Sequence, residues 1–343
     1  MARSKRIFIS DFHLNSQQRY QAGDAWFDPN IHQVRLINFL NNEVIAKAKL
    51  IKDLILLGDI FDNWVCPVGD VPPTYDAIGK DNAAIIDVLE QVQKKGIGLY
   101  YINGNHDFDL TAEQVRAIIP GVRPVRSYLG AGRSHAEHGH LYTLFNVLDY
   151  KSDPAFGRPI GYFITRLVTS IEGGGRGIAD ILHHLDDLLE AVFTPQTLAS
   201  SIIEALAERA GLQDDSLIEM PRGQQISVRL VKERYRDLGS HYGFWEAAER
   251  VSRDLGGLGG AADKLCKKMA YNVVLFGHTH KATIDKDWFL VEDRIYANTG
   301  AWCVDHAHCV EVDQTPKTRK VVVRLHSVGG NGQITGTVRK GFD

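Results

Sequence analysis

Aspartate, histidine and asparagine residues recur in short motifs along the 343-residue chain, most of them directly after a short apolar run. Two motifs, Asp-x-His and His-x-His, separate their polar residues by one position, so that in an extended chain both side chains would face the same side. The residues that could form a site in this way are Asp11, His13, Asp59, Asp62, Asn105, His106, His138, His278 and His280. Oxygen and imidazole donors without a thiolate favour manganese, iron or zinc over calcium or copper(I).

Each motif alone also has an ordinary interpretation. An isolated Asp-x-His is usually a surface pair, and Gly-Asn-His-Asp fits a tight turn with solvated side chains. In open α/β sheets, however, ligands gather beyond the carboxyl ends of the strands. Because the motifs recur in this position, the sequence predicts one shared metal site. We interpret Asp107 as a structural acceptor for loop amides, while for His140 both a contact with the site and a structural place stay open.

The elements that must position these motifs follow from hydrophobic periodicity. Helical spacing over residues 31–48 and 82–95 separates the first three apolar runs, and this alternation is typical of an α/β sheet with helical crossovers. The runs next to the motifs predict strands over residues 6–10, 53–57, 98–102 and 272–276. Further β-like segments are expected at residues 123–129, around 135, and at 288–291, 294–297, 309–312 and 320–325.

The middle third of the chain has a different pattern, because helix follows helix between glycine-rich turns. The expected helices cover residues 178–193, 197–210, 226–238 and 244–255. The sequence thus predicts a core formed by residues 1–150 and 270–328, a helical insertion or cap over 151–269, and a flexible, glycine-rich tail over 329–343. We expect the insertion to select the substrate and to supply no metal ligand.

Composition narrows the class of protein further. The formal net charge of −3 argues against a dedicated nucleic-acid binder. The four cysteines are widely spaced and form no Cys-x-x-Cys pair, which favours a reducing, cytoplasmic setting. No apolar run approaches the roughly 20 residues that a membrane span needs. The apolar stripes of the insertion leave peripheral membrane contact open.

Taken together, the motifs resemble the five motifs of the calcineurin-like metallophosphoesterase superfamily, and they span residues 11–280. The resemblance implies two mixed β-sheets packed as a sandwich flanked by helices. It implies two divalent cations, with manganese preferred and iron, zinc or magnesium as alternatives. One cation would be held by Asp11, His13, Asp59 and His280, and the other by Asp59, Asn105, His138 and His278. His106 would be the catalytic histidine and Asp62 its orienting carboxylate.

Three segments resemble one group of this superfamily, the UDP-2,3-diacylglucosamine pyrophosphohydrolases. They are residues 61–64 (Phe-Asp-Asn-Trp), 104–108 (Gly-Asn-His-Asp-Phe) and 298–302 (Asn-Thr-Gly-Ala-Trp). Well-known members of the group have arginine where His106 stands, and they are shorter, so this chain is interpreted as a relative of the group and not as the lipid A enzyme itself. The serine/threonine phosphatase branch is unsupported, because Asn63 replaces its arginine.

The expected reaction is hydrolysis of a phosphoester or pyrophosphate bond in an anionic substrate. Two divalent cations beside two aspartates would lower the pKa of bound water, so that hydroxide could attack phosphorus. His106 would then protonate the leaving oxygen. A UDP-sugar-lipid-like or other bulky phosphate is the favoured substrate class. The alternatives are a phosphodiesterase or nuclease on the same core, and a non-catalytic scaffold, which should have lost His106 or a metal ligand.

Overall fold

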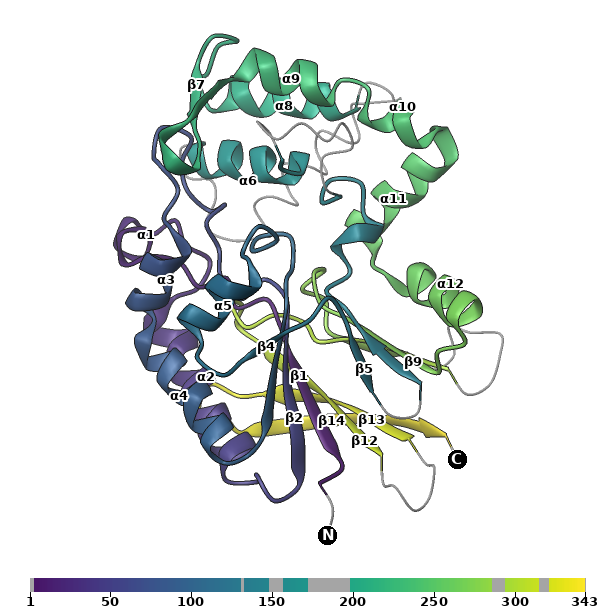
Figure 1. The fold of residues 1–343 in the computed structure, drawn as a ribbon. Coiled ribbons are helices and arrows are strands. Elements are labelled where there is room, and N and C mark those ends of the chain that lie inside the picture. The colour runs from purple at the N-terminus through teal and green to yellow at the C-terminus, as the bar shows by residue number, and fades with distance from the viewer. Residues whose placement is uncertain are drawn as a thin grey trace.

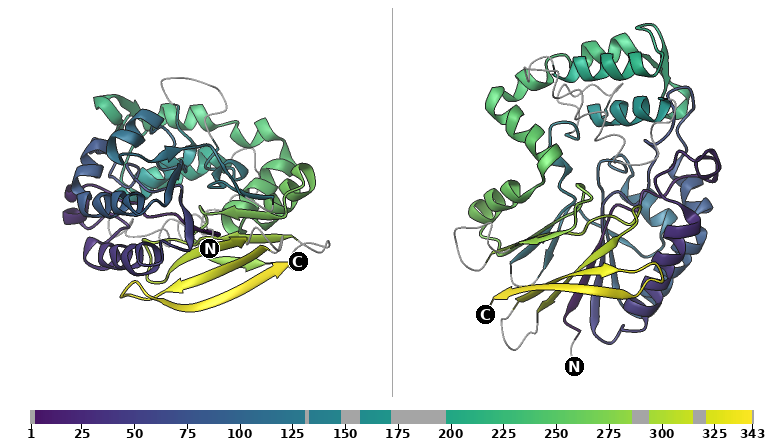
Figure 2. Two further views of the ribbon diagram at one scale, coloured as in Figure 1. Left: turned by 60° about the horizontal axis from the view of Figure 1, so that its bottom comes forward. Right: turned by 180° about the vertical axis from the view of Figure 1, so that it is seen from behind.

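The computed structural model describes residues 3–130, 133–147, 157–171, 198–285, 294–314 and 321–342. Its core is a sandwich of two mixed β-sheets, which confirms the predicted fold class. Helices line the outer side of the larger sheet, α12 lies beside the smaller one, and further helices form a cap at one end of the sandwich (Figure 1). Figure 2 shows the same layers from two other directions.

The larger sheet has seven strands in the order β14-β13-β12-β1-β2-β3-β4. Strands β1 to β4 run parallel, whereas β12, β13 and β14 continue the sheet in antiparallel pairs. The bounds are β1 Lys5–Ile9, β2 Ile51–Leu57, β3 Gly98–Ile102, β4 Arg123–Pro124, β12 Ala307–Gln314, β13 Val321–Val328 and β14 Ile334–Phe342.

The smaller sheet has five strands in the order β10-β11-β9-β6-β5, with parallel pairing of β9 to both β6 and β11. The bounds are β5 Tyr128–Gly130, β6 Ser134–Ala136, β9 Val273–Phe276, β10 Thr283–Asp285 and β11 Ile295–Asn298. Apolar residues of both sheets, such as Phe8, Leu57 and Leu275, form the buried layer between them. The carboxyl ends of β1, β2, β3 and β9 therefore open toward the same end of the sandwich.

Helices on the outer face of the larger sheet bury one apolar stripe each. In α4, for example, Ile85, Leu89 and Val92 are buried within the core cluster. The helices of the core are α1 Gln17–Ala22, η1 Pro29–Gln33, α2 Val34–Phe39, η2 Leu40–Ile45, α3 Tyr75–Asp81, α4 Ala83–Lys94, α5 Ala112–Ile118 and η3 His140–Tyr142. The helix predicted over residues 31–48 thus forms as three consecutive segments over 29–45.

The cap contains mostly helices, but also a small hairpin that the sequence did not indicate. Its elements are α6 Ile160–Ser170, α8 Leu198–Arg209, β7 Leu217–Glu219, η4 Pro221–Gly223, β8 Gln225–Ser227, α9 Val228–Tyr235, α10 Leu238–Tyr242 and α11 Phe244–Gly256. The helix expected from residue 226 begins only at Val228, because the Ser227 side chain accepts the Leu230 amide and caps it there. The predicted helix 178–193 and strand 288–291 lie outside the described residues.

Two further differences concern the ends of the predicted domains. The tail expected to be flexible over 329–343 instead forms β14, which pairs with β13 from Val321 opposite Phe342 to Val328 opposite Ile334. Its β-branched residues suit a strand, and this preference prevails over the glycine content. Helix α12, Gly259–Met269, packs with β9 in one apolar cluster, so it lies with the core rather than the cap. Within the described part of the chain, no helix has the length and apolar character to cross a bilayer.

Candidate metal centre

All nine predicted site residues meet at the carboxyl ends of β1, β2, β3, β6 and β9. The first group of possible ligand atoms contains Asp11, His13 and Asp59, all of which are buried. His13 Nε2 lies 4.0 Å from Asp11 Oδ1 and 3.9 Å from Asp59 Oδ2. His280 completes this group, because its Nε2 lies 3.2 Å from Asp11 Oδ1 and 3.0 Å from His13 Nε2.

The second group contains Asp59, His138 and His278. His138 Nε2 lies 3.0 Å from Asp59 Oδ2 and 3.2 Å from Asn105 Oδ1. Asp59 therefore belongs to both groups and offers the same oxygen, Oδ2, to each. This overlap is the arrangement that two neighbouring cations with one shared carboxylate would require.

The hydrogen bonds of the histidines direct one ring nitrogen of each toward the centre. The Nδ1 atom of His138 donates to the carbonyl oxygen of Leu57 at 2.8 Å, so Nε2 is the nitrogen that faces Asp59 and Asn105. The Nδ1 atom of His13 lies 2.8 Å from Asp62 Oδ2, which has the same effect. Carboxylate and carbonyl partners of this kind are typical of histidines that bind metals. The donor set thus fits divalent cations.

The backbone presents these ligands in a way that the sequence pattern did not indicate. Both members of the two spaced pairs have positive φ angles, 56° at Asp11, 54° at His13, 69° at His278 and 56° at His280. Asp59 has a φ of 53°. Such left-handed conformations are uncommon outside glycine and cluster at functional sites. The assumption of an extended chain was therefore wrong, because turned backbone brings each pair together.

Two glycines make room for the crowded side chains. A Cβ atom on Gly104 would overlap the Asp59 carboxylate, and one on Gly58 would overlap the His138 ring. Gly58 also has a φ of 91°, which side chains disfavour. The lack of space explains why both ligand motifs place a glycine directly before their first polar residue.

His106 lies beside the two groups and contacts Asp62. Its Nδ1 atom is 3.0 Å from Asp62 Oδ2, the oxygen that also binds His13. Burial opposes protonation of His106, but the Asp62 and Asp59 carboxylates outweigh it and raise the pKa of the ring. Burial likewise opposes ionisation of Asp62, yet His106 and His13 hold its pKa well below the usual range. The pair is therefore stabilised as an imidazolium and a carboxylate.

Two neighbours of the site can be placed as well. Asp107 accepts hydrogen bonds from the Ile60 amide at 2.8 Å, the Gly104 amide at 2.6 Å and the Tyr101 hydroxyl at 2.6 Å. It is a structural acceptor, as predicted. The His140 ring is buried, with its centroid 5.5 Å from that of His138. It is thus next to the second group of ligand atoms.

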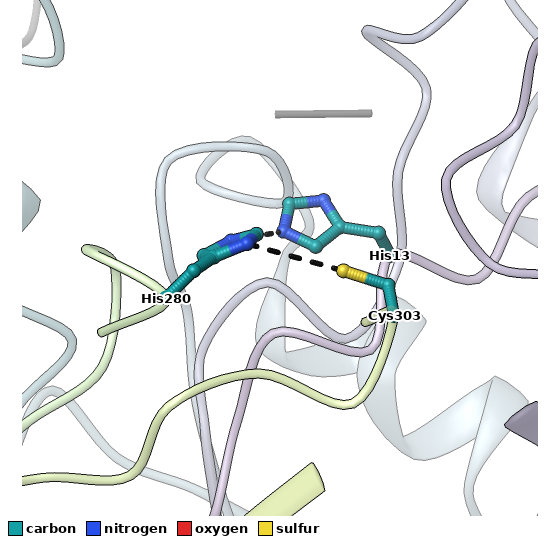
Figure 3. A group of neighbouring side chains, drawn as sticks. All are labelled: His13, His280 and Cys303. Atoms are coloured by element: carbon teal, nitrogen blue, oxygen red, sulfur yellow. Dashed lines mark hydrogen bonds between the residues drawn. The ribbon is translucent and has the colours of Figure 1, made fainter. Parts of the chain in front are cut away.

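Sequence reasoning missed two residues that line the centre. Cys303 lies with His13 and His280 in a third group of possible ligand atoms, and its Sγ is 4.0 Å from His280 Nδ1 (Figure 3). Burial and the nearby Asp11 and Asp62 raise the pKa of this thiol, so it stays protonated. The Trp26 ring lies 4.7 Å from the His13 ring and 5.4 Å from that of His106. Neither residue lies in or next to a ligand motif in the sequence. The fold alone brings both residues close to the metal centre.

Comparison with known proteins agrees with this geometry. A profile of the calcineurin-like phosphoesterase family matches residues 4–282. A UDP-2,3-diacylglucosamine hydrolase from Nitrosococcus oceani is 34% identical over 102 residues, which are 30% of this chain and 32% of that protein. The corresponding enzyme from Neisseria meningitidis serogroup B is 30% identical over 101 residues, or 29% of this chain and 33% of its own length. The match thus spans about a third of these relatives.

Among solved structures, a Vps29 variant from Entamoeba histolytica aligns with 99% of both chains at 10% identity and a TM-score of 0.37.

Proposed function

This chain belongs to the calcineurin-like phosphoesterase family, and from that premise we propose that it hydrolyses phosphoester or pyrophosphate bonds with two divalent cations. The observation that carries the proposal is the position of Asp59 Oδ2 between two groups of ligand atoms. Asp11, His13, Asp59 and His280 would hold one cation. Asp59, Asn105, His138 and His278 would hold the other.

Manganese is the proposed ion, with iron, zinc or magnesium as alternatives, because oxygen and imidazole donors make up both proposed ligand sets. When bound, such cations would neutralise phosphate oxygens and lower the pKa of a water molecule. The residues of the chain keep the ligands in place before any cation binds. Asp62 and Leu57 hold the His13 and His138 rings in the orientation that points Nε2 into the centre.

His106 is the proposed general acid. Asp62 engages its Nδ1 atom, which leaves the proton on Nε2 for the leaving oxygen of the substrate. The Asp62 carboxylate beside Nδ1 favours the protonated form of the ring. Trp64 stacks on the ring with centroids 4.3 Å apart and an angle of 27°, and it fixes the plane in which the proton would be delivered.

For the substrate we propose a phosphate or pyrophosphate that carries a bulky organic group. The names of the relatives found by comparison support this class, since they are UDP-2,3-diacylglucosamine hydrolases. The buried indole rings of Trp26 and Trp64 pack against the histidines of the centre and hold them in place.

A panel of substrates tests the proposal. The purified chain, stripped of metal and reloaded with manganese, is incubated with an aryl phosphate, an aryl phosphodiester, a UDP-sugar and a cyclic nucleotide. We expect manganese-dependent release of product from at least one of the monoester or pyrophosphate substrates. Turnover of the diester and the cyclic nucleotide alone would assign the phosphodiesterase alternative, and no turnover of any of the four would contradict the proposal.

A further inference from the structure

A chain of hydrogen bonds connects the cap with a proposed metal ligand. Asn105 presents its Oδ1 atom 3.2 Å from His138 Nε2, inside the second group of ligand atoms. The other end of the same amide, Nδ2, donates to Asn146 Oδ1 at 3.1 Å. Asn146 in turn places its own Nδ2 3.5 Å from Asp254 Oδ1, and the same atom lies 3.5 Å from Nε2 of His278 in the second group. Asp254 belongs to helix α11 of the cap, whereas Asn105 follows strand β3 of the core.

The donor-to-acceptor direction of these hydrogen bonds is set by Asp254, at the cap end. In its ionised form Asp254 can only accept hydrogen bonds, so it attracts the NH₂ end of the Asn146 amide and turns its oxygen away. Burial raises the pKa of Asp254 to about 7, so this form prevails above that pH. That oxygen can only accept as well, so it attracts the NH₂ end of Asn105. The Asn105 oxygen is then left facing His138 and Asp59. A flipped Asn105 amide would instead direct a partial positive charge at the cation position.

The segment that carries Asn146 is held on two sides by the cap. Asp254 Oδ2 accepts the backbone amides of Leu144 at 2.8 Å and Phe145 at 3.3 Å. From the other side, the amide of Gly161 in α6 donates to the carbonyl oxygen of Phe145 at 2.8 Å. A Cβ atom on Gly161 would come within 2.5 Å of Asn146 Oδ1, so the helix approaches this side chain closely. The position of Asn146 therefore depends on how the cap packs.

We propose that Asn146 and Asp254 are positioning residues that set the amide of Asn105 with its oxygen toward the second cation, so that filling of this position depends on the cap. The inference rests on the proposed function, since it assumes two cation positions that share Asp59. It changes the role expected for the insertion. The cap would control metal binding through hydrogen bonds, in addition to any part in substrate selection.

We call the hydrogen bonds from Asp254 through Asn146 to Asn105 the relay. Manganese binding to the metal-free protein tests it, and Asn146→Ala is the main variant. We expect its second manganese ion to bind about 10- to 100-fold more weakly, the usual effect of losing an outer partner of a metal ligand. The first ion should bind with nearly unchanged affinity, because its ligands do not contact Asn146. In electron paramagnetic resonance, the spin-coupled pair seen in the wild type should give way to a mononuclear signal at the same manganese concentration.

Two more variants separate the relay from general damage to the fold. Asp254→Asn preserves the shape of the side chain but lets it donate to Asn146, so the polarity is lost and the second ion should again bind more weakly. Glu249→Gln removes a carboxylate from the same helix, where Glu249 pairs with Arg253 and Lys264, and it should bind both ions like the wild type. Asp254→Asn also replaces Asn146→Ala if the latter does not fold.

The possible outcomes distinguish a failure of the relay from a failure of the proposed binuclear function. Wild-type binding of both ions by Asn146→Ala or Asp254→Asn would overturn the relay and leave the proposed function intact. An equal loss at both positions would also overturn it, since that result indicates general loosening of the fold. A wild-type chain that binds fewer than two ions would remove the binuclear centre, and the relay with it.

Discussion

His106, the proposed general acid, shares its carboxylate partner with a proposed metal ligand. One oxygen of Asp62 contacts both His106 and His13, while the other accepts the amides of Trp64 at 2.7 Å and Val65 at 3.1 Å. The carboxylate is thus fixed by the turn that follows β2. It can orient the general acid and a cation ligand together, which explains why the sequence places Asp62 only three positions after Asp59.

The role of His106 can be separated from metal binding. We expect His106→Ala to retain the manganese content of the wild type and to lose about 10² to 10⁴-fold in kcat, the usual contribution of general acid catalysis. The loss should be smaller for p-nitrophenyl esters, whose leaving group needs no proton. Steady-state kinetics on aryl phosphates of graded leaving-group pKa measure this dependence. A loss that is equal for all leaving groups would assign His106 another task.

Which side chains meet at this end of the sandwich could be predicted from the sequence, but their conformation could not. Motifs after strands report which side chains are available, and the parallel pairing of the strands makes those side chains meet. The left-handed φ angles of Asp11 and His13 leave no trace in residue type, because neither residue is a glycine. Cys303 and Trp26 also escaped, since they reach the centre only through the packing of distant segments.

At the scale of elements, one buried arginine fastens the cap to the core. Arg166 of α6 is fully buried, and its guanidinium donates to the carbonyl oxygens of Pro67 at 2.6 Å, Asp70 at 2.7 Å and Glu219 at 2.8 Å. It also donates to the Tyr162 hydroxyl at 2.7 Å. Backbone oxygens thus replace water around a buried charge, and they join α6, the loop after β2 and the hairpin.

Removing this arginine should destabilise the protein strongly. Arg166→Met leaves several buried carbonyl groups without donors, each of which costs about 1–3 kcal/mol. We therefore expect the free energy of unfolding to fall by about 3 kcal/mol or more in urea titrations. Arg166→Lys should recover little, because a single ammonium group cannot reach all the acceptors. Arg229→Lys on the exposed side of α9 is the control, and an Arg166→Met variant as stable as this control would contradict the assignment.

A second element, the start of the helix at Pro29–Gln33, makes stability depend on pH. His32 is buried and accepts the Asp28 amide with Nδ1 at 2.9 Å, so the ring must be neutral. Burial and the neighbouring Arg35 lower its pKa to about 4. The unfolded chain, with an ordinary pKa of about 6.5, binds the proton first as pH falls. The contribution of the neutral His32 ring to stability should therefore be fully present above about pH 6.5 and should decrease toward pH 4.

The His32→Asn variant isolates this effect, because an amide oxygen can accept the same hydrogen bond without titrating. Between pH 7 and pH 5 we expect the wild type to lose about 2 kcal/mol more unfolding free energy than the variant. Urea titrations at both pH values give the difference. Parallel pH profiles for the two proteins would show that His32 does not titrate as inferred.

The elements themselves could be predicted to different degrees. The predictions of the parallel strands and of α4 were correct, because long apolar runs and one amphipathic stripe are strong local signals. Strand β14 was missed, since glycines in its sequence resemble a disordered tail, and only pairing with β13 stabilises it. The hairpin β7–β8 was missed for a similar reason. Three residues per strand are too few to show a period.

At the scale of the whole molecule, the sandwich and the cap have different roles. The core supplies every residue of the two ligand groups, from loops after β1, β2, β3, β6 and β9. The cap contacts these loops through α6 and α11. The predicted boundaries at residues 150 and 270 stay an interpretation, although the packing of α12 on β9 argues for a cap that ends before residue 259.

The central claim is that two cations share the Asp59 carboxylate. Anomalous diffraction from crystals of the full chain grown with manganese tests it most directly, because each bound ion gives its own peak. The account predicts two peaks about 3.5–4 Å apart, one beside Asp11, His13 and His280 and the other beside Asn105, His138 and His278, with Asp59 between them. A single peak, or two peaks of which only one lies next to Asp59, would contradict it.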